Sequence, residues 1–104
     1  MYKSKPKEED MIVLNVTYKC KPGMREGFLN AIAAEGIDSS SRAEEGNCKY
    51  DYYLSAADSD ELLLVEKWQD QDAVSAHGKM PHFIRLGELK KDYVADTVIE
   101  RYNA

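Results

Sequence analysis

The sequence predicts an α+β domain with the element order βαββαβ, the ferredoxin-like arrangement of helices on one face of an antiparallel sheet. Three observations predict it. Four segments alternate with the period of two that strands require, and the regions between them carry apolar residues at helical spacing. Only a short polar segment, residues 55–61, separates the second predicted strand from the third, which favours a hairpin. The 104 residues suffice for one domain with one hydrophobic core.

The first strand is predicted over residues 11–20, MIVLNVTYKC. By the period of two, one face holds Ile12, Leu14, Val16, Tyr18 and Cys20, and the other holds Met11, Val13, Asn15 and Thr17. Pro22 and Gly23 break this strand. A helix is then predicted over residues 24–42, and Gly36 weakens its middle by roughly 1 kcal/mol relative to alanine.

The second strand is predicted over residues 48–54. One of its faces is predicted to hold Cys48, Tyr50, Tyr52 and Leu54. The third strand is predicted over residues 61–68, whose apolar run suits a buried strand and is too short to span a membrane. The last strand is predicted over residues 94–102.

Two helices are predicted between the third and fourth strands. Asp70 or Asp72 can cap the first of them by accepting a hydrogen bond from its free N–H groups. Gly78 can end this helix, and Pro81 can open the next one. His77 then falls in the last turn of the first helix, on a largely apolar face.

The first and third predicted strands carry apolar residues on both faces, whereas the open face of a lone two-layer domain is usually polar. A second copy of the chain is the simplest cover for this face, so we expect a homodimer with two-fold symmetry. Residues 11–104 are expected to form the single domain. The polar residues 1–10 are expected to form a flexible N-terminal leader.

Fourteen basic and nineteen acidic residues give a net charge of −5 and a pI near 5.0. This balance argues against nucleic acid as a partner, because binding phosphates requires a basic face. No apolar run is long enough to cross a membrane, and no hydrophobic region follows the N-terminal lysines as in a signal peptide. Cys20 and Cys48 lack metal-ligand spacing, and we expect them to be reduced, buried thiols in a cytoplasmic protein.

The residue types suited to chemistry concentrate in residues 62–83. This stretch holds the only two histidines, His77 and His82, the only tryptophan, Trp68, and an acid, Glu66, at the end of a buried strand. Histidine suits a general base because its ordinary pKa is about 6.5. The two histidines are five residues apart, without a supporting cysteine, so we expect no metal site.

Glu66 is in phase with Leu62 and Leu64 on the buried face of its strand. Such a carboxylate must either reach the end of the sheet or pair with a residue such as Arg42 or Arg85. The sequence contains no glycine-rich nucleotide motif, so a nucleotide cofactor has no support in it.

Three segments together resemble one family. Residues 41–53, SRAEEGNCKYDYY, resemble the SR-x-E-x-G turn and following strand of the antibiotic biosynthesis monooxygenase family, which includes quinol monooxygenases. Residues 65–83, VEKWQDQDAVSAHGKMPHF, resemble its middle signature, and residues 21–29, KPGMREGFL, resemble its first strand-to-helix junction. The resemblance covers nearly all of residues 11–90 and implies a dimeric α/β barrel built from ferredoxin-like domains.

The resemblance also implies an activity, the oxygenation of a hydroquinone or polycyclic phenol without flavin, haem or metal. His77 or His82 would remove a phenolic proton, and the substrate anion would react directly with O2. By residue match, the substrate pocket would be formed by Glu66, Trp68, His77, His82 and Phe83, with Asn15 and Tyr52 as further contacts. Arg42 and Glu44 match the turn of the family and are expected to be structural.

The sequence departs from the family pattern at Asn47, because members often have cysteine directly after the glycine. The Gly-Asn pair resembles the autoinducer-2 processing isomerase, which acts on a small phosphorylated diketone and would use the same histidines as acid and base. Basic residues facing the pocket, such as Arg85 or Lys79, would favour the isomerase, and an apolar, aromatic lining would favour the oxygenase. A non-catalytic small-molecule-binding dimer is a third possibility. Haem-degrading relatives need a histidine near Gly87, where this chain has none.

Overall fold

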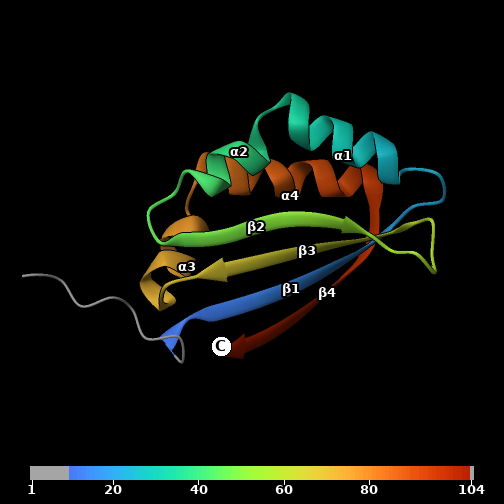
Figure 1. Cartoon of the computed structure of the whole chain (residues 1–104). Helices are drawn as coiled ribbons and strands as arrows, with labels where there is room; N and C mark the ends of the chain where they lie inside the picture. Colours follow the sequence, from blue (N-terminus) through green and yellow to red (C-terminus); the bar gives the residue numbers. More distant parts are fainter. Residues whose placement is uncertain (1–9, 104) are drawn as a thin grey trace, which may run out of the picture.

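The computed structural model describes residues 10–103, and Figure 1 shows a sheet with helices stacked on one of its faces. The strands are β1 (Ile12–Cys20), β2 (Asn47–Leu54), β3 (Glu61–Trp68) and β4 (Val94–Asn103). The helices are α1 (Arg25–Ala34), α2 (Ile37–Arg42), α3 (Gln71–His77) and α4 (Pro81–Tyr93). Apart from Asp10, the predicted leader falls on residues 1–9, outside the described residues.

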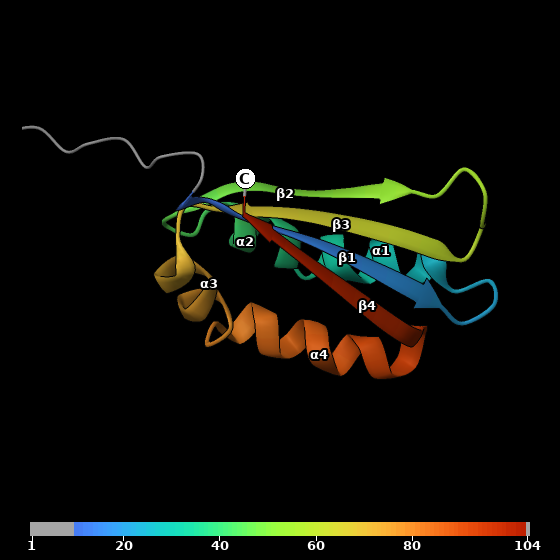
Figure 2. The ribbon, with the colours of Figure 1, turned by 90° about the horizontal axis from the view of Figure 1, so that it is seen from below.

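Neighbouring strands pair antiparallel in the order β2-β3-β1-β4. β1 therefore lies between β3 and β4, and its Leu14 pairs with Glu66 on one side and with Arg101 on the other. In Figure 2 the helices α1 to α4 lie together on one side of this sheet. This topology is the ferredoxin-like α+β fold that the sequence predicts.

The hydrophobic core lies between the sheet and the helices. In β3 every second residue is buried against the helices, namely Leu62, Leu64, Glu66 and Trp68. The helices contribute Phe28 and Ile32 from α1, Ile37 from α2, and Leu86 and Leu89 from α4. The alternation that buries the leucines therefore also carries the carboxyl group of Glu66 into an apolar layer.

The helix predicted over residues 24–42 is in fact two helices. α1 ends at Ala34 and α2 begins at Ile37, after Gly36, whose backbone φ is 66°. This left-handed conformation cannot continue a right-handed helix and is easily adopted only by glycine. After this break, α2 leads directly into the turn that carries Glu44 towards β2.

The prediction that Cys48 is buried on the same face as Tyr50 is wrong. The pairing of β2 with β3 shifts register between Asn47 and Lys49, which leaves an additional residue in β2. Cys48 is consequently exposed, whereas Cys20 is buried as expected. Both thiols are free.

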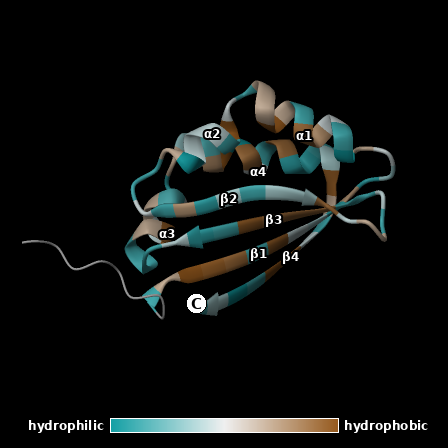
Figure 3. Cartoon of the chain, viewed as in Figure 1, coloured by the Kyte–Doolittle hydropathy of each residue, from teal (hydrophilic) through white to brown (hydrophobic). Residues whose placement is uncertain are grey.

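The face of the sheet opposite the helices is apolar at its centre. Val13, Leu63 and Val65 are half-buried there, and Val98 and Tyr102 of β4 are exposed. In Figure 3, β1 and β3 are coloured as largely hydrophobic strands. This same pattern predicted a homodimer from the sequence, and the homodimer stays a prediction.

The longest helix that the structure describes, α4, has 13 residues and carries lysines in its last turn. Across residues 10–103, no helix combines the length and the apolar character that crossing a membrane requires. The cytoplasmic location stays a prediction from the sequence.

Candidate functional site

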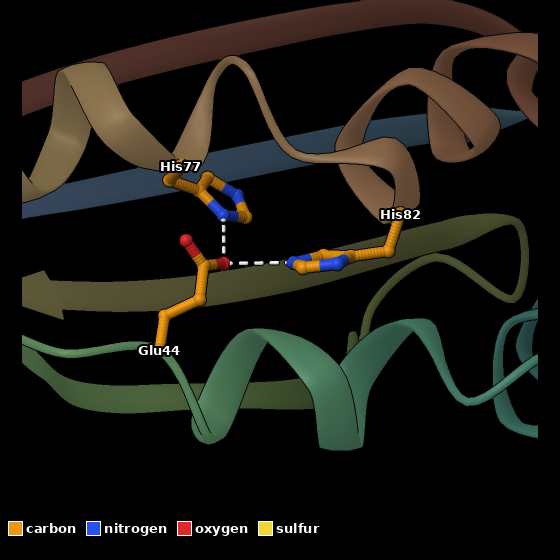
Figure 4. Close-up of side chains that lie close together, drawn as sticks. All are labelled: Glu44, His77 and His82. Carbon is orange, nitrogen blue, oxygen red and sulfur yellow. Dashed lines mark hydrogen bonds and ion pairs between the residues drawn. The ribbon is translucent and has the colours of Figure 1, made fainter.

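Three segments that are distant in the sequence meet at one end of the helical layer (Figure 4). Glu44 lies in the turn between α2 and β2, His77 is the last residue of α3, and His82 lies in the first turn of α4. Asp70 caps the start of α3, and Pro81 opens α4, as the sequence predicts. These two signals fix where α3 and α4 begin, and thereby where both histidines lie.

One carboxylate oxygen joins the two histidines. The Oε2 atom of Glu44 accepts hydrogen bonds from Nδ1 of His77 at 2.5 Å and from Nε2 of His82 at 2.8 Å. The side chains of Glu44 and His77 are each 6% exposed, and that of His82 is 17% exposed. Because a carboxylate only accepts hydrogen bonds, these contacts place a proton on Nδ1 of His77 and leave Nε2 as the basic nitrogen of the neutral ring.

The Nε2 atom of His77 faces Glu66 and lies 3.9 Å from its Oε1 atom. The same oxygen accepts a hydrogen bond of 3.0 Å from the indole N–H of Trp68. Burial raises the pKa of Glu66 to about 7, and the charge of Glu44 adds to this rise, while the hydrogen bond from Trp68 opposes it. A carboxyl group with a pKa near neutrality can give up or take a proton at physiological pH.

Burial lowers the pKa of His77, and the hydrogen bond and charge of Glu44 act against this shift. Aromatic rings surround the imidazole. Its centroid lies 4.7 Å from that of Trp68, 5.1 Å from that of Phe83 and 5.8 Å from that of Tyr50. His77 is thus a neutral imidazole, held in an apolar environment, with a basic nitrogen directed at an acid.

A cavity of about 120 Å³ lies beside Glu66, between α4 and the sheet. Its wall is mainly apolar and includes Tyr18, Phe83 and Ile99, while its acidic and basic residues are Glu66 and Lys90. Phe83 is 43% exposed and Ile99 is 63% exposed, so the cavity opens to solvent between α4 and β4. Glu66 therefore connects the buried histidine to a space that a small ligand can enter.

Five of the seven predicted site residues come together here, namely Glu66, Trp68, His77, His82 and Phe83. Tyr52 lies one ring further out, because it packs edge-on against Tyr50 with 6.0 Å between the ring centroids, and it also lines a separate hollow of about 540 Å³ against α1 and α2. Asn15 does not join them. It is one residue out of phase with Leu14, the partner of Glu66 in β1, and it therefore lies on the face of the sheet away from the helices.

Of the two alternatives for Glu66, the pairing with an arginine such as Arg42 or Arg85 does not form. The guanidinium group of Arg42 donates hydrogen bonds to Asp38 and to the backbone oxygen of Tyr50. Arg85 donates to both carboxylate oxygens of Glu35, at 2.6 Å and 2.9 Å. The buried carboxyl group instead accepts a hydrogen bond from the indole of Trp68, and no lysine or arginine within residues 10–103 is paired with it.

Glu44 is the site residue that the sequence did not single out. The resemblance assigned it a structural place in its turn, whereas its carboxylate makes the contacts that hold both histidines. Its spacing to the glycine that follows is the one sequence signal that marks it.

Glu44, His77 and His82 are also residue types that bind divalent metal ions. Their nearest ligand atoms all lie within 4.8 Å of one another. In the present arrangement, however, each histidine directs a protonated nitrogen at the carboxylate, so a metal ion would have to replace both hydrogen bonds. The metal-free site expected from the sequence stays a prediction.

Two known proteins are similar to this chain in sequence. The chain is 40% identical over 73 residues to "Putative monooxygenase YcnE" of Bacillus subtilis, which covers 70% of this chain and 75% of that protein. It is also 40% identical over 69 residues to "Putative monooxygenase Rv0793" of Mycobacterium tuberculosis, which covers 62% of this chain and 67% of that protein.

Solved structures share the fold. PA3566 from Pseudomonas aeruginosa superposes with a TM-score of 0.82 at 25% identity, covering 91% of this chain and 94% of that chain. A structure from Nitrosomonas europaea, titled "Putative antibiotic biosynthesis monooxygenase", superposes with a TM-score of 0.83 at 23% identity, covering 100% of this chain and 95% of that chain.

The fold and the site define a ferredoxin-like α+β protein with a buried cluster of two histidines and two glutamates beside an apolar cavity. The sequence profile of the family described as "Antibiotic biosynthesis monooxygenase" matches residues 11–88, which is most of the chain. The chain belongs to the antibiotic biosynthesis monooxygenase family.

Proposed function

We propose that this protein is a cofactor-independent monooxygenase that transfers one oxygen atom from O2 to a small phenol or hydroquinone. The names of its relatives point to this class of reaction. The observation that carries the proposal is the series Glu44, His77 and Glu66, which runs from the buried cluster to the wall of an apolar cavity. The proposal needs no flavin, haem or metal, and O2 is the co-substrate.

In this proposal the base is His77. Glu44 holds the proton on Nδ1, as the carboxylate of a catalytic triad does, so that Nε2 can accept a proton. Glu66 lies between that nitrogen and the cavity, within 3.9 Å of the nitrogen, and it passes the phenolic proton to His77. His82 donates to the same carboxylate and positions it.

Removal of the phenolic proton gives an electron-rich anion, which transfers one electron to O2. The resulting substrate radical and superoxide join through a new C–O bond and form a peroxide. Cleavage of its O–O bond releases water, so that a hydroquinone and O2 give a hydroxyquinone and H2O. The apolar wall keeps water away from the anion and the radical pair, and the protein contributes orientation rather than redox chemistry.

The cavity limits the size of the substrate. Cavities of about 150 Å³ in protein cores bind benzene, so about 120 Å³ accommodates a single ring more readily than a polycyclic phenol. The homodimer expected from the apolar open face of the sheet is part of the proposal, with that face as the interface and the cavity on the other side of the sheet.

One observation favours a second function, the isomerisation of a small phosphorylated diketone. A basic residue, Lys90, does line the cavity. Arg85 and Lys79, the basic residues considered from the sequence for an isomerase, do not line the cavity. Arg85 pairs with Glu35 on the surface, and Lys79 is exposed outside the cavity wall. The mainly apolar lining is the feature expected of an oxygenase.

The test is oxygen uptake by the purified protein with a panel of single-ring hydroquinones, measured against autoxidation without protein. His77→Gln is expected to lower the protein-dependent rate by about 10²-fold or more, because the base is lost. His82→Gln is the matched control, since it changes the other histidine on the same carboxylate and is expected to retain a larger rate. Addition of a chelator is expected to leave the rate unchanged.

Uptake at the autoxidation rate with every hydroquinone would count against the oxygenase. Conversion of a phosphorylated diketone under nitrogen would then support the isomerase, and binding without conversion of any compound would support a non-catalytic binding protein. An equal loss of rate in both histidine variants would contradict the assignment of His77 as the base and His82 as a positioning residue.

A further inference from the structure

The cavity has a basic side chain on its wall that the proposed proton transfer does not use. Phe83, Leu86, Gly87 and Lys90 follow the helical spacing i, i+3, i+4 and i+7, so they form one face of α4, and this face is the helical wall of the cavity. Lys90 is half-buried and ends this row.

The ammonium group of Lys90 is unpaired within the described residues. It takes part in no hydrogen bond or ion pair there, and it lies over the ring of Tyr18, whose centroid is 5.5 Å from Nζ. Two cationic side chains nearby are engaged, because Arg85 is paired with Glu35 and Lys21 donates to the backbone oxygen of Lys91. A cation beside an apolar cavity, stacked on an aromatic ring and without a hydrogen-bond or ion-pair partner among residues 10–103, is available to an anionic ligand group.

Lys90 and Glu66 both line the cavity, and the spacing along α4 and β1 indicates that they lie towards different ends of it. Phe83 marks the Glu66 end, because the ring of His77 contacts Phe83 while its Nε2 atom faces Glu66. Lys90 follows seven residues later, which corresponds to about 10 Å along the helix. The strands agree, because Tyr18, beneath Lys90, is four residues from Leu14, the strand partner of Glu66.

We propose that the cavity recognises a single-ring phenol that carries an anionic substituent, with its hydroxyl group at Glu66 and its anionic group at Lys90. The position of the phenol rests on the function proposed above, whereas the role of Lys90 rests on the cavity and its unpaired charge. The volume of about 120 Å³ holds the ring, and the opening between α4 and β4 leaves room for the substituent. Lys90 is thus a specificity-determining residue for substrate.

The experiment measures binding by calorimetry under nitrogen, so that it does not depend on turnover. The ligands are para-hydroxyphenylacetate and its amide, which have the same shape and differ in charge. Hydroquinone monophosphate is added to distinguish a carboxylate from a phosphate as the preferred anionic group. Trp68, the only tryptophan of the chain and a neighbour of His77, provides a second signal through its fluorescence.

The wild-type protein is expected to bind the acid about tenfold more tightly than the amide. Lys90→Met is expected to remove this preference by weakening the acid about tenfold while leaving the amide within about twofold, and Lys90→Arg is expected to restore it. Lys91→Met is the matched control, because it removes the same charge from the next residue, which is exposed and outside the cavity wall. It is expected to behave as the wild type.

Equal affinity for acid and amide in the wild type, or an unchanged preference in Lys90→Met, would overturn the proposal. Failure of both compounds and of the phosphate to bind would overturn it as well. A charge preference that depends on Lys90, combined with no oxygen uptake, would leave the recognition intact and would reject the oxygenase alone.

Discussion

The Nε2 atom of His77 lies 3.9 Å from Oε1 of Glu66, with no hydrogen on that nitrogen in the tautomer that Glu44 enforces. The imidazole of His77 lies between two carboxyl groups, and each of its nitrogens faces one of them. Glu44 fixes the ring and its proton on one side, and the acid on the other side has a pKa of about 7. In the function proposed above, this arrangement would carry protons between the cavity and the cluster through groups that can be neutral near physiological pH.

Glu44→Gln is expected to lower the protein-dependent oxygen uptake by about 10²-fold to 10⁴-fold, because a glutamine amide no longer fixes the productive tautomer of His77. The pKa of His77 is expected to fall further in this variant, since Glu44 acts to raise it, and NMR titration of the ring measures this change without any substrate. Glu45→Gln, a change at the adjacent exposed residue, is the control. An unchanged pKa of His77 in Glu44→Gln would contradict the role given to this carboxylate.

The fold could be predicted from the sequence because its determinants are local. The period of two in β3, together with the capping aspartate and the proline around α3 and α4, gave bounds close to the observed ones. Gly36 was recognised as a weak point, but the helical period on both sides concealed that its φ of 66° ends one helix and starts another. The helical spacing of apolar residues does not reveal a single residue whose backbone conformation differs from that of its neighbours.

The candidate site was predicted less completely, because its contacts join residues far apart in the sequence. Glu44 lies 33 residues from His77 and 38 from His82, and no local pattern records such a contact. The sequence left two alternatives for Glu66, a position at the end of the sheet or a pairing with an arginine, because a buried charge needs solvent or a partner. Burial instead raises the pKa of this carboxyl group, so that it can remain neutral. Asn15 was proposed from family resemblance, although the period of two in β1 already placed it on the other face of the strand from Leu14.

Gly46→Ala is expected to destabilise the protein by about 2–3 kcal/mol. The φ of Gly46 is 86°, and a Cβ atom there would lie 2.7 Å from Cβ of Ala73 in α3, which is too close for two carbon atoms that are not bonded to each other. The control is Gly87→Ala in the middle of α4, where a Cβ atom meets nothing within 4 Å, and which is expected to stabilise the protein by about 1 kcal/mol. Urea unfolding measures both changes, and equal stability of Gly46→Ala and wild type would contradict the packing described for this turn.

Leu63→Asp is expected to convert a homodimer into a monomer. Leu63 lies at the centre of the open face of the sheet, between Tyr53 of β2 and Thr17 of β1, so a charge there would be buried against the second copy. Light scattering is expected to give about twice the chain mass of 11.8 kDa for the wild type and the chain mass for this variant. Ile84→Asp, on an exposed position of α4, is expected to leave the dimer intact. A wild-type mass of one chain at all concentrations would reject the dimer.

Glu66→Gln is expected to change how stability depends on pH. Burial raises the pKa of Glu66 from 4.5 to about 7, so between these values the folded chain holds a proton that the unfolded chain releases. The stabilising contribution of the neutral carboxyl group is complete below pH 4.5 and is lost as the pH rises to about 7, a loss of about 3 kcal/mol. Glutamine does not titrate, so the free energy of unfolding of Glu66→Gln should rise by this amount relative to wild type across that interval, as urea unfolding at a series of pH values would measure. Glu61→Gln, on the half-buried opposite face of β3, is the control. Parallel pH profiles for wild type and Glu66→Gln would show that Glu66 ionises as an ordinary surface carboxylate. Glu66 could then not exchange protons with His77 near neutral pH.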